Sequence, residues 1–211
     1  MQNGNYETLR LLGHGEFGVS YLANELATNI TVVIKEVPYD SQENIRLLDE
    51  AVVKIRQCCE LVPEVASLLY EVLNIPAAPI ESKTFAMSQN IDMQTLDGHQ
   101  TSKEKKRIVR SLVIEHFVDK SLRTYIATLK KLNGQIEEQK AWDVFTKILI
   151  SLHEMHSKRL IHKNLKAENI FLIEEDWYAK FSDIGFYRYP RIGETRNVLY
   201  LPPEMIQDEF D

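Results

Sequence analysis

The sequence of 211 residues predicts an α+β fold, with strands dominating the first part of the chain and helices the second. Five short apolar runs bounded by glycine or polar residues predict strands, at residues 6–12, 19–22, 30–37, 65–73 and 110–117. Three segments place apolar residues at helical spacing, at residues 41–60, 121–132 and 138–156. The second helix is predicted to end at Asn133-Gly134, a common stop signal.

The composition excludes several classes of function. A net charge of -6 gives the chain no general attraction to nucleic acid or to an anionic membrane. No apolar run is long enough to span a bilayer, and residues 1–10 lack the apolar core of a signal peptide. The only cysteines, Cys58 and Cys59, are adjacent and offer neither a disulfide framework nor a set of metal ligands. We therefore expect a cytoplasmic or otherwise intracellular protein with no nucleic-acid or membrane partner.

Two signals near the start of the chain point to phosphate binding. Residues 13–18 read G-H-G-E-F-G, and Gly13, Gly15 and Gly18 would let backbone N–H groups approach phosphate oxygens. An ordinary glycine-rich hairpin explains the same pattern. Lys35 lies in the apolar run V-V-I-K-E-V; if it is buried it needs an anion, whereas at a strand edge it would reach solvent. Lys35 follows Gly13 by 22 residues, a separation suited to one small sheet, so the two signals reinforce each other.

The helix predicted at residues 41–60 offers two candidate partners for Lys35. We prefer Glu50, while Asp49 is the alternative with a shorter reach. Residues 74–107 form an unusually long connection, rich in Ser, Gln and Asp, which predicts a flexible insertion between two strands. Its basic end, K-E-K-K-R, is interpreted as a solvated loop, with a docking patch as the alternative.

The helix predicted at residues 138–156 carries the strongest apolar stripe in the chain. The stripe is expected to be core and consists of Trp142, Phe145, Ile148, Leu149, Leu152 and Met155. His153 and His156 share a face of this helix, but no carboxylate or cysteine set with ligand spacing accompanies them. A metal site there is therefore the weaker interpretation.

The most polar stretch next to a predicted strand lies at residues 161–172 and reads I-H-K-N-L-K-A-E-N-I-F-L. It is followed by S-D-I-G at residues 182–185 and L-P-P-E at residues 201–204. In this order, the three resemble the H-R-D-x-K-x-x-N, D-F-G and A-P-E motifs of protein kinases. V-I-K-E-V around Lys35 and E-N-I-F-L at residues 168–172 look most like the NIMA-related (Nek) serine/threonine kinases.

The resemblance implies a bilobal protein-kinase fold over residues 1–211. The N-lobe, at residues 1–117, would be an antiparallel sheet, and residues 118–211 would form a mainly helical, truncated C-lobe. The cofactors would be ATP and Mg²⁺, with a protein as substrate or partner. The nucleotide would be bound by Gly13, Gly15, Gly18, Lys35, Glu50, Glu115, Phe117 and Phe171. Asn169 and Asp183 would hold Mg²⁺, and Lys166 would contact the γ-phosphate.

Several positions depart from the family pattern, namely Ser20, Lys163, Asn164, Ile184 and Asn197. Asn164 matters most, because it stands where kinases place the catalytic Asp. An amide accepts no proton at neutral pH, and a positioned general base is worth about 10²–10⁴ in rate. The candidate phosphorylation sites of the activation segment are Tyr187, Tyr189, Thr195 and Tyr200.

Three functional hypotheses follow. The first is a Nek-like pseudokinase that binds ATP and Mg²⁺, transfers phosphate poorly and acts as an interaction module, with a cytoskeletal location suggested by the family. The second is a slow serine/threonine kinase, in which Asn164 still orients the substrate hydroxyl through its carbonyl oxygen. The third is a degenerate kinase fold that binds no nucleotide. It is suggested by Ser20, by the short C-lobe and by Lys54, which lies one turn after Glu50 where kinases usually place an apolar residue.

Overall fold

The computed structural model describes residues 2–3, 5–76, 108–117, 121–173, 178–187 and 200. Most of the predicted insertion, at residues 77–107, lies outside the described residues, as do the L-P-P-E segment, Asn197, Tyr189 and Thr195. Two of the candidate phosphorylation sites are described: Tyr187 is half-buried and Tyr200 is exposed.

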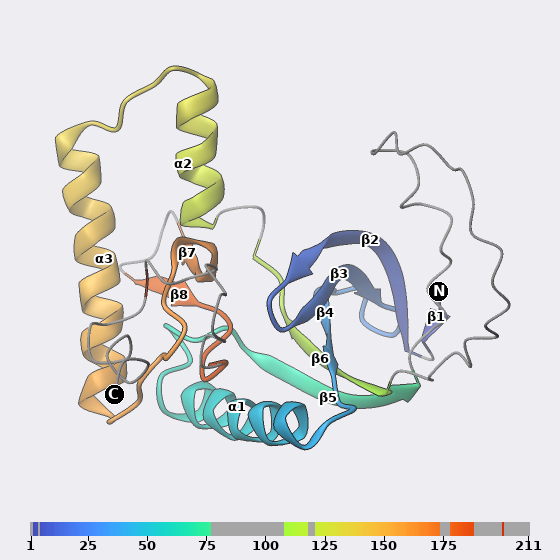
Figure 1. The fold of residues 1–211 in the computed structure, drawn as a ribbon. Helices are drawn as coiled ribbons and strands as arrows, with labels where there is room; N and C mark the ends of the chain where they lie inside the picture. Colours follow the sequence, from blue (N-terminus) through green and yellow to red (C-terminus); the bar gives the residue numbers. More distant parts are fainter. Residues whose placement is uncertain are drawn as a thin grey trace, which may run out of the picture.

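One antiparallel sheet of six strands is the main structure in the N-terminal part of the chain (Figure 1). Its strands are β1 (Gln2–Asn3), β2 (Tyr6–Gly15), β3 (Gly18–Glu25), β4 (Thr31–Pro38), β5 (Leu69–Pro76) and β6 (Ile108–Glu115). They lie in the order β1-β2-β3-β4-β6-β5, and every neighbouring pair is antiparallel. The α+β fold class predicted from the sequence is confirmed.

The fourth predicted strand begins later than the apolar run suggests. Val65 and Ser67 do not join the large sheet; they pair with Phe181, whose N–H donates to the Val65 carbonyl at 2.8 Å while its carbonyl accepts from the Ser67 N–H at 2.8 Å. The apolar run from residue 65 therefore pairs first with Phe181 and then with β6, and β5 starts at Leu69. This division connects the sheet to the second half of the chain.

Strand β4 lies at the centre of the sheet and presents different side chains to its two faces. Val32 and Ile34 pack with Tyr6, Ala23 and Val113 in one apolar cluster. Because side chains alternate along a strand, Lys35 shares the opposite face with Val37, which belongs to the main core. Lys35 is thus directed toward the interior between the two halves of the molecule, where it is 5% exposed.

Helix α1 (Gln42–Leu61) covers this inner face. Its N-terminus is capped by Ser41, whose Oγ accepts a hydrogen bond from the Asn44 N–H at 3.2 Å. The buried residues of α1 recur at helical spacing along one face, at Leu48, Ala51, Val52, Ile55 and Cys58. This face fixes which carboxylates of the helix can point inward.

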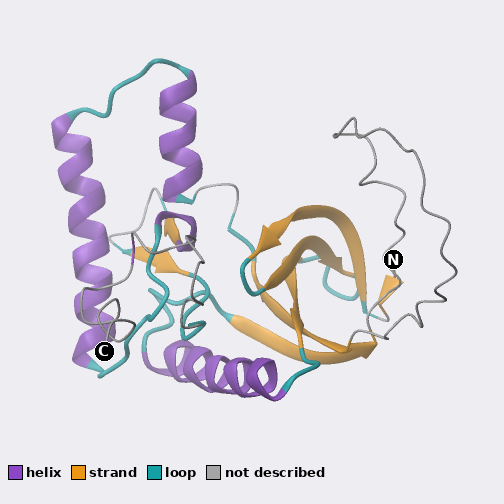
Figure 2. Cartoon of the chain, viewed as in Figure 1, coloured by secondary structure: helices purple, strands orange, loops and turns teal. Residues whose placement is uncertain are grey.

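Helices α2 (Leu122–Lys131) and α3 (Glu138–Ser157) lie away from the large sheet and are joined by the loop of residues 132–137 (Figures 1 and 2). The apolar stripe predicted as core on α3 divides in two. Met155 is fully buried near β8, whereas Trp142, Phe145 and Leu149 are 57%, 50% and 48% exposed. The prediction was wrong for these three, because the contacts of α3 with β8 and the core are made by its later residues. None of the helices in the described part of the chain combines the length and the apolar character needed to cross a bilayer.

A small two-stranded sheet of β7 (Ile170–Leu172) and β8 (Ala179–Phe181) lies between α3 and the large sheet (Figure 1). A single 3-10 turn, η1 (Ala167–Asn169), leads into β7. The main core runs through this junction, joining Phe181, Ile184 and Phe186 to α1 and to Met155. The polar residues 161–169 and the S-D-I-G segment are therefore held against a rigid core.

Candidate functional site

The glycine-rich segment forms the tight turn between β2 and β3. Gly13 and Gly15 belong to β2, Gly18 begins β3, and Glu16 and Phe17 form the turn itself. Of these three glycines, Gly18 is the one that a larger residue could not replace without strain. Its φ is +151°, and a Cβ at this position would lie 1.9 Å from the Glu36 carbonyl oxygen. A Cβ on Gly13 would meet nothing within 4 Å, so this glycine leaves open space along the strand.

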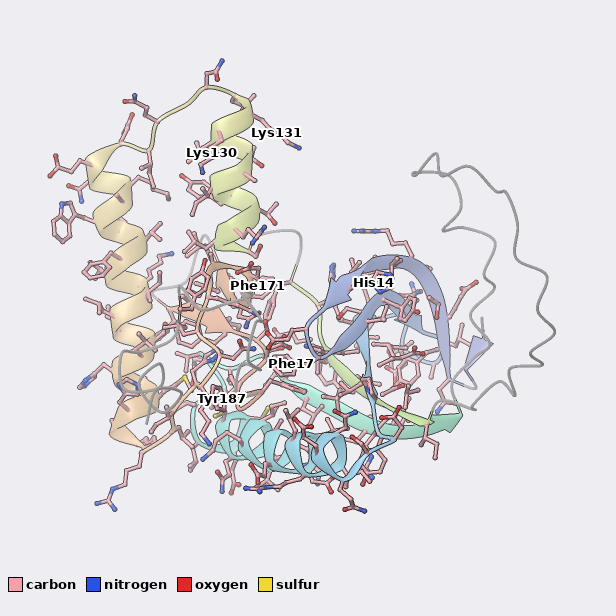
Figure 3. The ribbon with its side chains drawn as sticks, in the orientation of Figure 1. His14, Phe17, Lys130, Lys131, Phe171 and Tyr187 are labelled. Atoms are coloured by element: carbon pink, nitrogen blue, oxygen red, sulfur yellow. The ribbon has the colours of Figure 1, made fainter. Side chains whose placement is uncertain are left out.

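The tip of this turn is folded inward. Phe17 is 5% exposed and belongs to the main core, with its ring centroid 5.2 Å from that of Phe186. Lys35 Nζ lies 4.7 Å from the Phe186 ring centroid and 6.0 Å from that of Phe17, within cation–π range. In Figure 3, Phe17 lies between the β2–β3 hairpin and the helical half of the chain. Sequence reasoning missed both aromatic residues, although each stands inside or next to a glycine motif.

The anion that a buried Lys35 requires is Asp183. Lys35 Nζ lies 2.5 Å from Asp183 Oδ1, and the side chain of Asp183 is 19% exposed. Asp183 has φ of +55°, a left-handed conformation that Asp tolerates better than most residues. Gly185 follows with φ of +78°, where a Cβ would lie 2.9 Å from the Lys54 Cβ. The S-D-I-G segment is thus a tight turn that presents one carboxylate to the lysine of β4.

The predicted partner, Glu50, does not contact Lys35 among the described contacts and is exposed on α1. Its carboxylate pairs with Arg46 at 2.7 Å, which lowers the pKa of Glu50. Asp49, the alternative, pairs with Arg110 at 2.6 Å. The residues of α1 that face the S-D-I-G turn are Ala51 and Lys54, whose Cα and Cβ would lie 3.4 and 2.9 Å from a Cβ on Gly185. One residue along a helix rotates a side chain by about 100°, so Glu50 points away where Ala51 points in.

The loop before β7 is held by a neutral, buried histidine. His162 is 3% exposed, and its Nδ1 accepts a hydrogen bond from the Asn164 N–H at 3.2 Å. Burial lowers the pKa of His162 to about 4, although the charge of Asp183 acts in the opposite direction. The Gly185 N–H donates to the His162 carbonyl at 2.8 Å. This histidine therefore joins the polar loop to the S-D-I-G turn, a role the sequence reasoning did not assign.

Asn164 and Asn169 are joined across the same loop. The Asn169 side-chain amide donates to the Asn164 carbonyl at 2.8 Å, and the Asn169 carbonyl accepts from the Ser182 N–H at 3.0 Å. Because Nδ2 of Asn169 is used in this way, its Oδ1 is the atom available to a cation. Asn164 Nδ2 is buried and has no hydrogen-bond partner among the described residues.

The residue types at this point fit Mg²⁺. Magnesium prefers oxygen ligands, often one or two protein groups completed by phosphate and water. Asp183 offers a carboxylate, and Asn169, whose backbone carbonyl accepts from the N–H of the preceding Ser182, offers an amide oxygen. Within the described residues, no group of three or more His, Cys, Asp and Glu side chains could hold a metal ion by protein ligands alone. The pair His153 and His156 belongs to no such group.

Lys166, the other cation of the site, also has a partner. Its Nζ lies 3.6 Å from Glu16 Oε2, at the tip of the β2–β3 turn, with the two side chains 13% and 29% exposed. This contact crosses from the large sheet to the loop before β7. Sequence reasoning placed Glu16 in the glycine motif but gave it no function.

The segment after β6 meets β7 through two aromatic rings. The ring centroids of Phe117 and Phe171 are 4.6 Å apart with planes tilted by 38°. The carboxylate of Glu115 is turned away to Lys180 at 2.9 and 3.0 Å and accepts from the Leu68 N–H at 3.1 Å. The backbone N–H of Glu115 is also engaged, donating to the Leu68 carbonyl at 2.9 Å, and the rings of Phe117 and Phe171 form an aromatic pair (Figure 3 labels Phe171).

Comparison with known proteins agrees with this geometry. Residues 6–210 match the model of the protein kinase domain. Similar proteins include the serine/threonine-protein kinase Nek8 of Danio rerio, 24% identical over 210 residues that cover 96% of this chain and 25% of that protein. Nekl-2 of Caenorhabditis elegans is 25% identical over 217 residues, covering 96% of this chain and 51% of the relative. Serine/threonine-protein kinase B of Synechocystis is 28% identical over 186 residues, which cover 87% of this chain and 27% of that protein. The chain thus spans a quarter to a half of the length of these relatives.

Proposed function

The chain belongs to the protein kinase family, and from this premise we propose that it is a Nek-like pseudokinase domain that binds ATP and Mg²⁺ but transfers phosphate poorly. The observation that carries the proposal is Asn164 at the position of the general base, in a loop that keeps His162, Lys166 and Asn169 of the family pattern. Such a domain would act on a protein partner by binding rather than by chemistry.

The support from Asn164 is chemical. Its backbone is anchored on both sides, through its N–H to His162 and its carbonyl to Asn169, so the scaffold that would present a base is intact. What differs is the side chain, because an amide cannot accept a proton from a hydroxyl at neutral pH. Losing a general base costs about 10²–10⁴ in rate. Phosphoryl transfer depends mostly on positioning and charge neutralisation, so the loss lowers the rate without abolishing nucleotide binding.

A second observation acts in the same direction. Lys35 pairs with Asp183, the proposed Mg²⁺ ligand, while the positions of α1 that face the S-D-I-G turn are occupied by Ala51 and Lys54. With no helix carboxylate to position Lys35, the ammonium group is positioned by Asp183 and by the rings of Phe17 and Phe186. Lys35 could then still bind phosphate, but its ammonium group would align the phosphates less precisely for transfer.

The residues that would bind the cofactors have separate tasks. Asp183 and Asn169 would hold Mg²⁺, and Lys35 and Lys166 would neutralise phosphate oxygens. Phe117 and Phe171 would lie against the base. ATP would supply a transferable phosphoryl group, and the metal would neutralise charge on it.

The alternative function is a slow serine/threonine kinase. It is favoured by the presence of Lys166, Asn169 and Asp183 around the loop of Asn164. In this case the side-chain amide oxygen of Asn164, Oδ1, orients the substrate hydroxyl, and restoring the carboxylate with Asn164→Asp raises the rate by orders of magnitude. No gain in a folded variant would count against this alternative.

Thermal unfolding with and without ATP and Mg²⁺ tests nucleotide binding. ATP at about 100 times its Kd stabilises the native state by about 2.7 kcal/mol, which corresponds to about 5–10 °C for a chain of this size. We expect this shift to require Mg²⁺ and to disappear in Lys35→Ala, when each protein is compared with its own ligand-free form. Lys131→Ala, an exposed lysine at the end of α2, is the matched control and should keep the shift. A folded wild-type protein with no shift would refute the proposal and favour a scaffold without nucleotide.

A further inference from the structure

The two lysines of the proposed nucleotide site are both paired with carboxylates of the chain itself. Lys35 lies 2.5 Å from Asp183, and Lys166 lies 3.6 Å from Glu16. The two cations and the two carboxylates give this group of four side chains no net charge. An anionic ligand therefore gains from a lysine only by displacing one of the carboxylates or by approaching close to it.

Glu16 is the more easily displaced of the two carboxylates. The Glu16–Lys166 distance is longer than the Lys35–Asp183 distance, and the side chain of Glu16 is 29% exposed against 19% for Asp183. Asp183 is in addition fixed by the left-handed turn that precedes Gly185. Binding of a triphosphate that reaches Lys166 would therefore leave Lys35–Asp183 in place and separate Lys166 from Glu16.

The displaced carboxylate cannot move far. Glu16 is followed directly by Phe17, which is 5% exposed and packed against Phe186 in the main core. On the other side, Gly15 pairs with Gly18 at the end of the β2–β3 ladder. The backbone of Glu16 is thus held over Lys166, and its negative charge stays near any group that binds there.

We propose that Glu16 is a specificity-determining residue that takes the place of a terminal phosphate on Lys166, so that the site favours a nucleoside diphosphate over a triphosphate. The inference rests on the proposed function, in which Lys166 faces the third phosphate. A diphosphate reaches Lys35 and leaves the Glu16–Lys166 pair intact. A triphosphate must break that pair and place its last phosphate beside a carboxylate.

The test is a comparison of ADP and ATP affinities, measured by titration calorimetry at one free Mg²⁺ concentration. We expect the wild-type protein to bind ADP about fivefold more tightly than ATP, the size of one partly screened charge contact. Glu16→Gln keeps the shape of the side chain and removes its charge, and it should tighten ATP binding about fivefold with little change for ADP. Glu16→Ala serves as a second variant with the same expected direction. Glu7→Gln is the matched control, since it removes an exposed charge from the same strand and should leave the ratio unchanged.

The outcomes separate this inference from the proposed function. Tighter binding of ATP than ADP by the wild-type protein, with both affinities changed equally by Glu16→Gln, would overturn the role of Glu16 and leave nucleotide binding standing. Binding of ATP only after Glu16→Gln would support the inference in its strongest form. If neither the wild-type protein nor the two Glu16 variants bound either nucleotide, both proposals would fall.

Discussion

Replacing Phe17 with Ala removes the side chain that anchors the β2–β3 turn. Phe17 is 5% exposed, although it lies at the tip of a turn whose neighbour Glu16 is partly in solvent. Its ring contacts Phe186 at a centroid distance of 5.2 Å and lies 6.0 Å from Lys35 Nζ. The perturbation therefore removes core packing and loosens the placement of Glu16 at the same time.

The expected cost can be worked out from this burial. Buried Phe→Ala substitutions cost about 3–5 kcal/mol, and an aromatic pair contributes about 1 kcal/mol of that. Because Phe17 lies on a turn, which can relax more readily than a strand in the middle of a sheet, we expect a value at the low end, about 3 kcal/mol. For a protein of this size, that corresponds to a fall in Tm of about 6–12 °C.

Urea unfolding followed by circular dichroism measures this loss, with the slope compared between proteins to check that the unfolded state is unchanged. Phe145→Ala is the matched control, because it makes the same chemical change on α3, where Phe145 is 50% exposed. The control should lose less than about 1 kcal/mol. Equal losses for the two variants would refute the inward placement of Phe17 and, with it, the anchoring of Glu16.

Two further predictions concern the backbone and the loop histidine. Gly18→Ala should lower the free energy of unfolding in urea by more than about 1 kcal/mol, because the new Cβ would lie 1.9 Å from the Glu36 carbonyl oxygen. Gly13→Ala is the control, since a Cβ there meets nothing within 4 Å. Equal losses for the two variants would contradict this geometry. The pKa of His162 falls from 6.5 to about 4 on folding, so the unfolded chain binds the extra proton and stability is lost as the pH falls through this window. The stability difference between the wild-type protein and His162→Gln should therefore shrink by about 2 kcal/mol from pH 7 to pH 5, and a constant difference would show that His162 is not buried in its neutral form.

The fold and the burial of Lys35 could be predicted because their signals are local. The apolar runs located five strands of the large sheet, and the lone lysine in V-V-I-K-E-V indicated a buried cation that needs an anion. Lys35 is indeed 5% exposed and paired. The helix caps at Ser41 and Ser121 follow directly from residue type at the helix starts.

The features that could not be predicted depend on how elements pack. Apolar spacing places α1 but leaves its rotation uncertain by a residue, and one residue decides whether Glu50 or Ala51 points inward. On α3, the spacing of Trp142 and Phe145 is that of a core face, yet no described element covers them. Glu16 and Phe17 were visible within the glycine motif, but their contacts with Lys166 and Phe186 lie more than a hundred residues away along the chain.

The most direct test of the central claim is phosphate transfer from ATP in the presence of Mg²⁺, measured for the wild-type chain, Asp183→Ala and Asn164→Asp. The account predicts that the wild-type rate stays close to that of Asp183→Ala, because Asn164 supplies no base, while the wild-type chain still shows the Mg²⁺-dependent thermal shift. Robust transfer by the wild-type chain that is lost in Asp183→Ala would contradict the account and identify a working kinase.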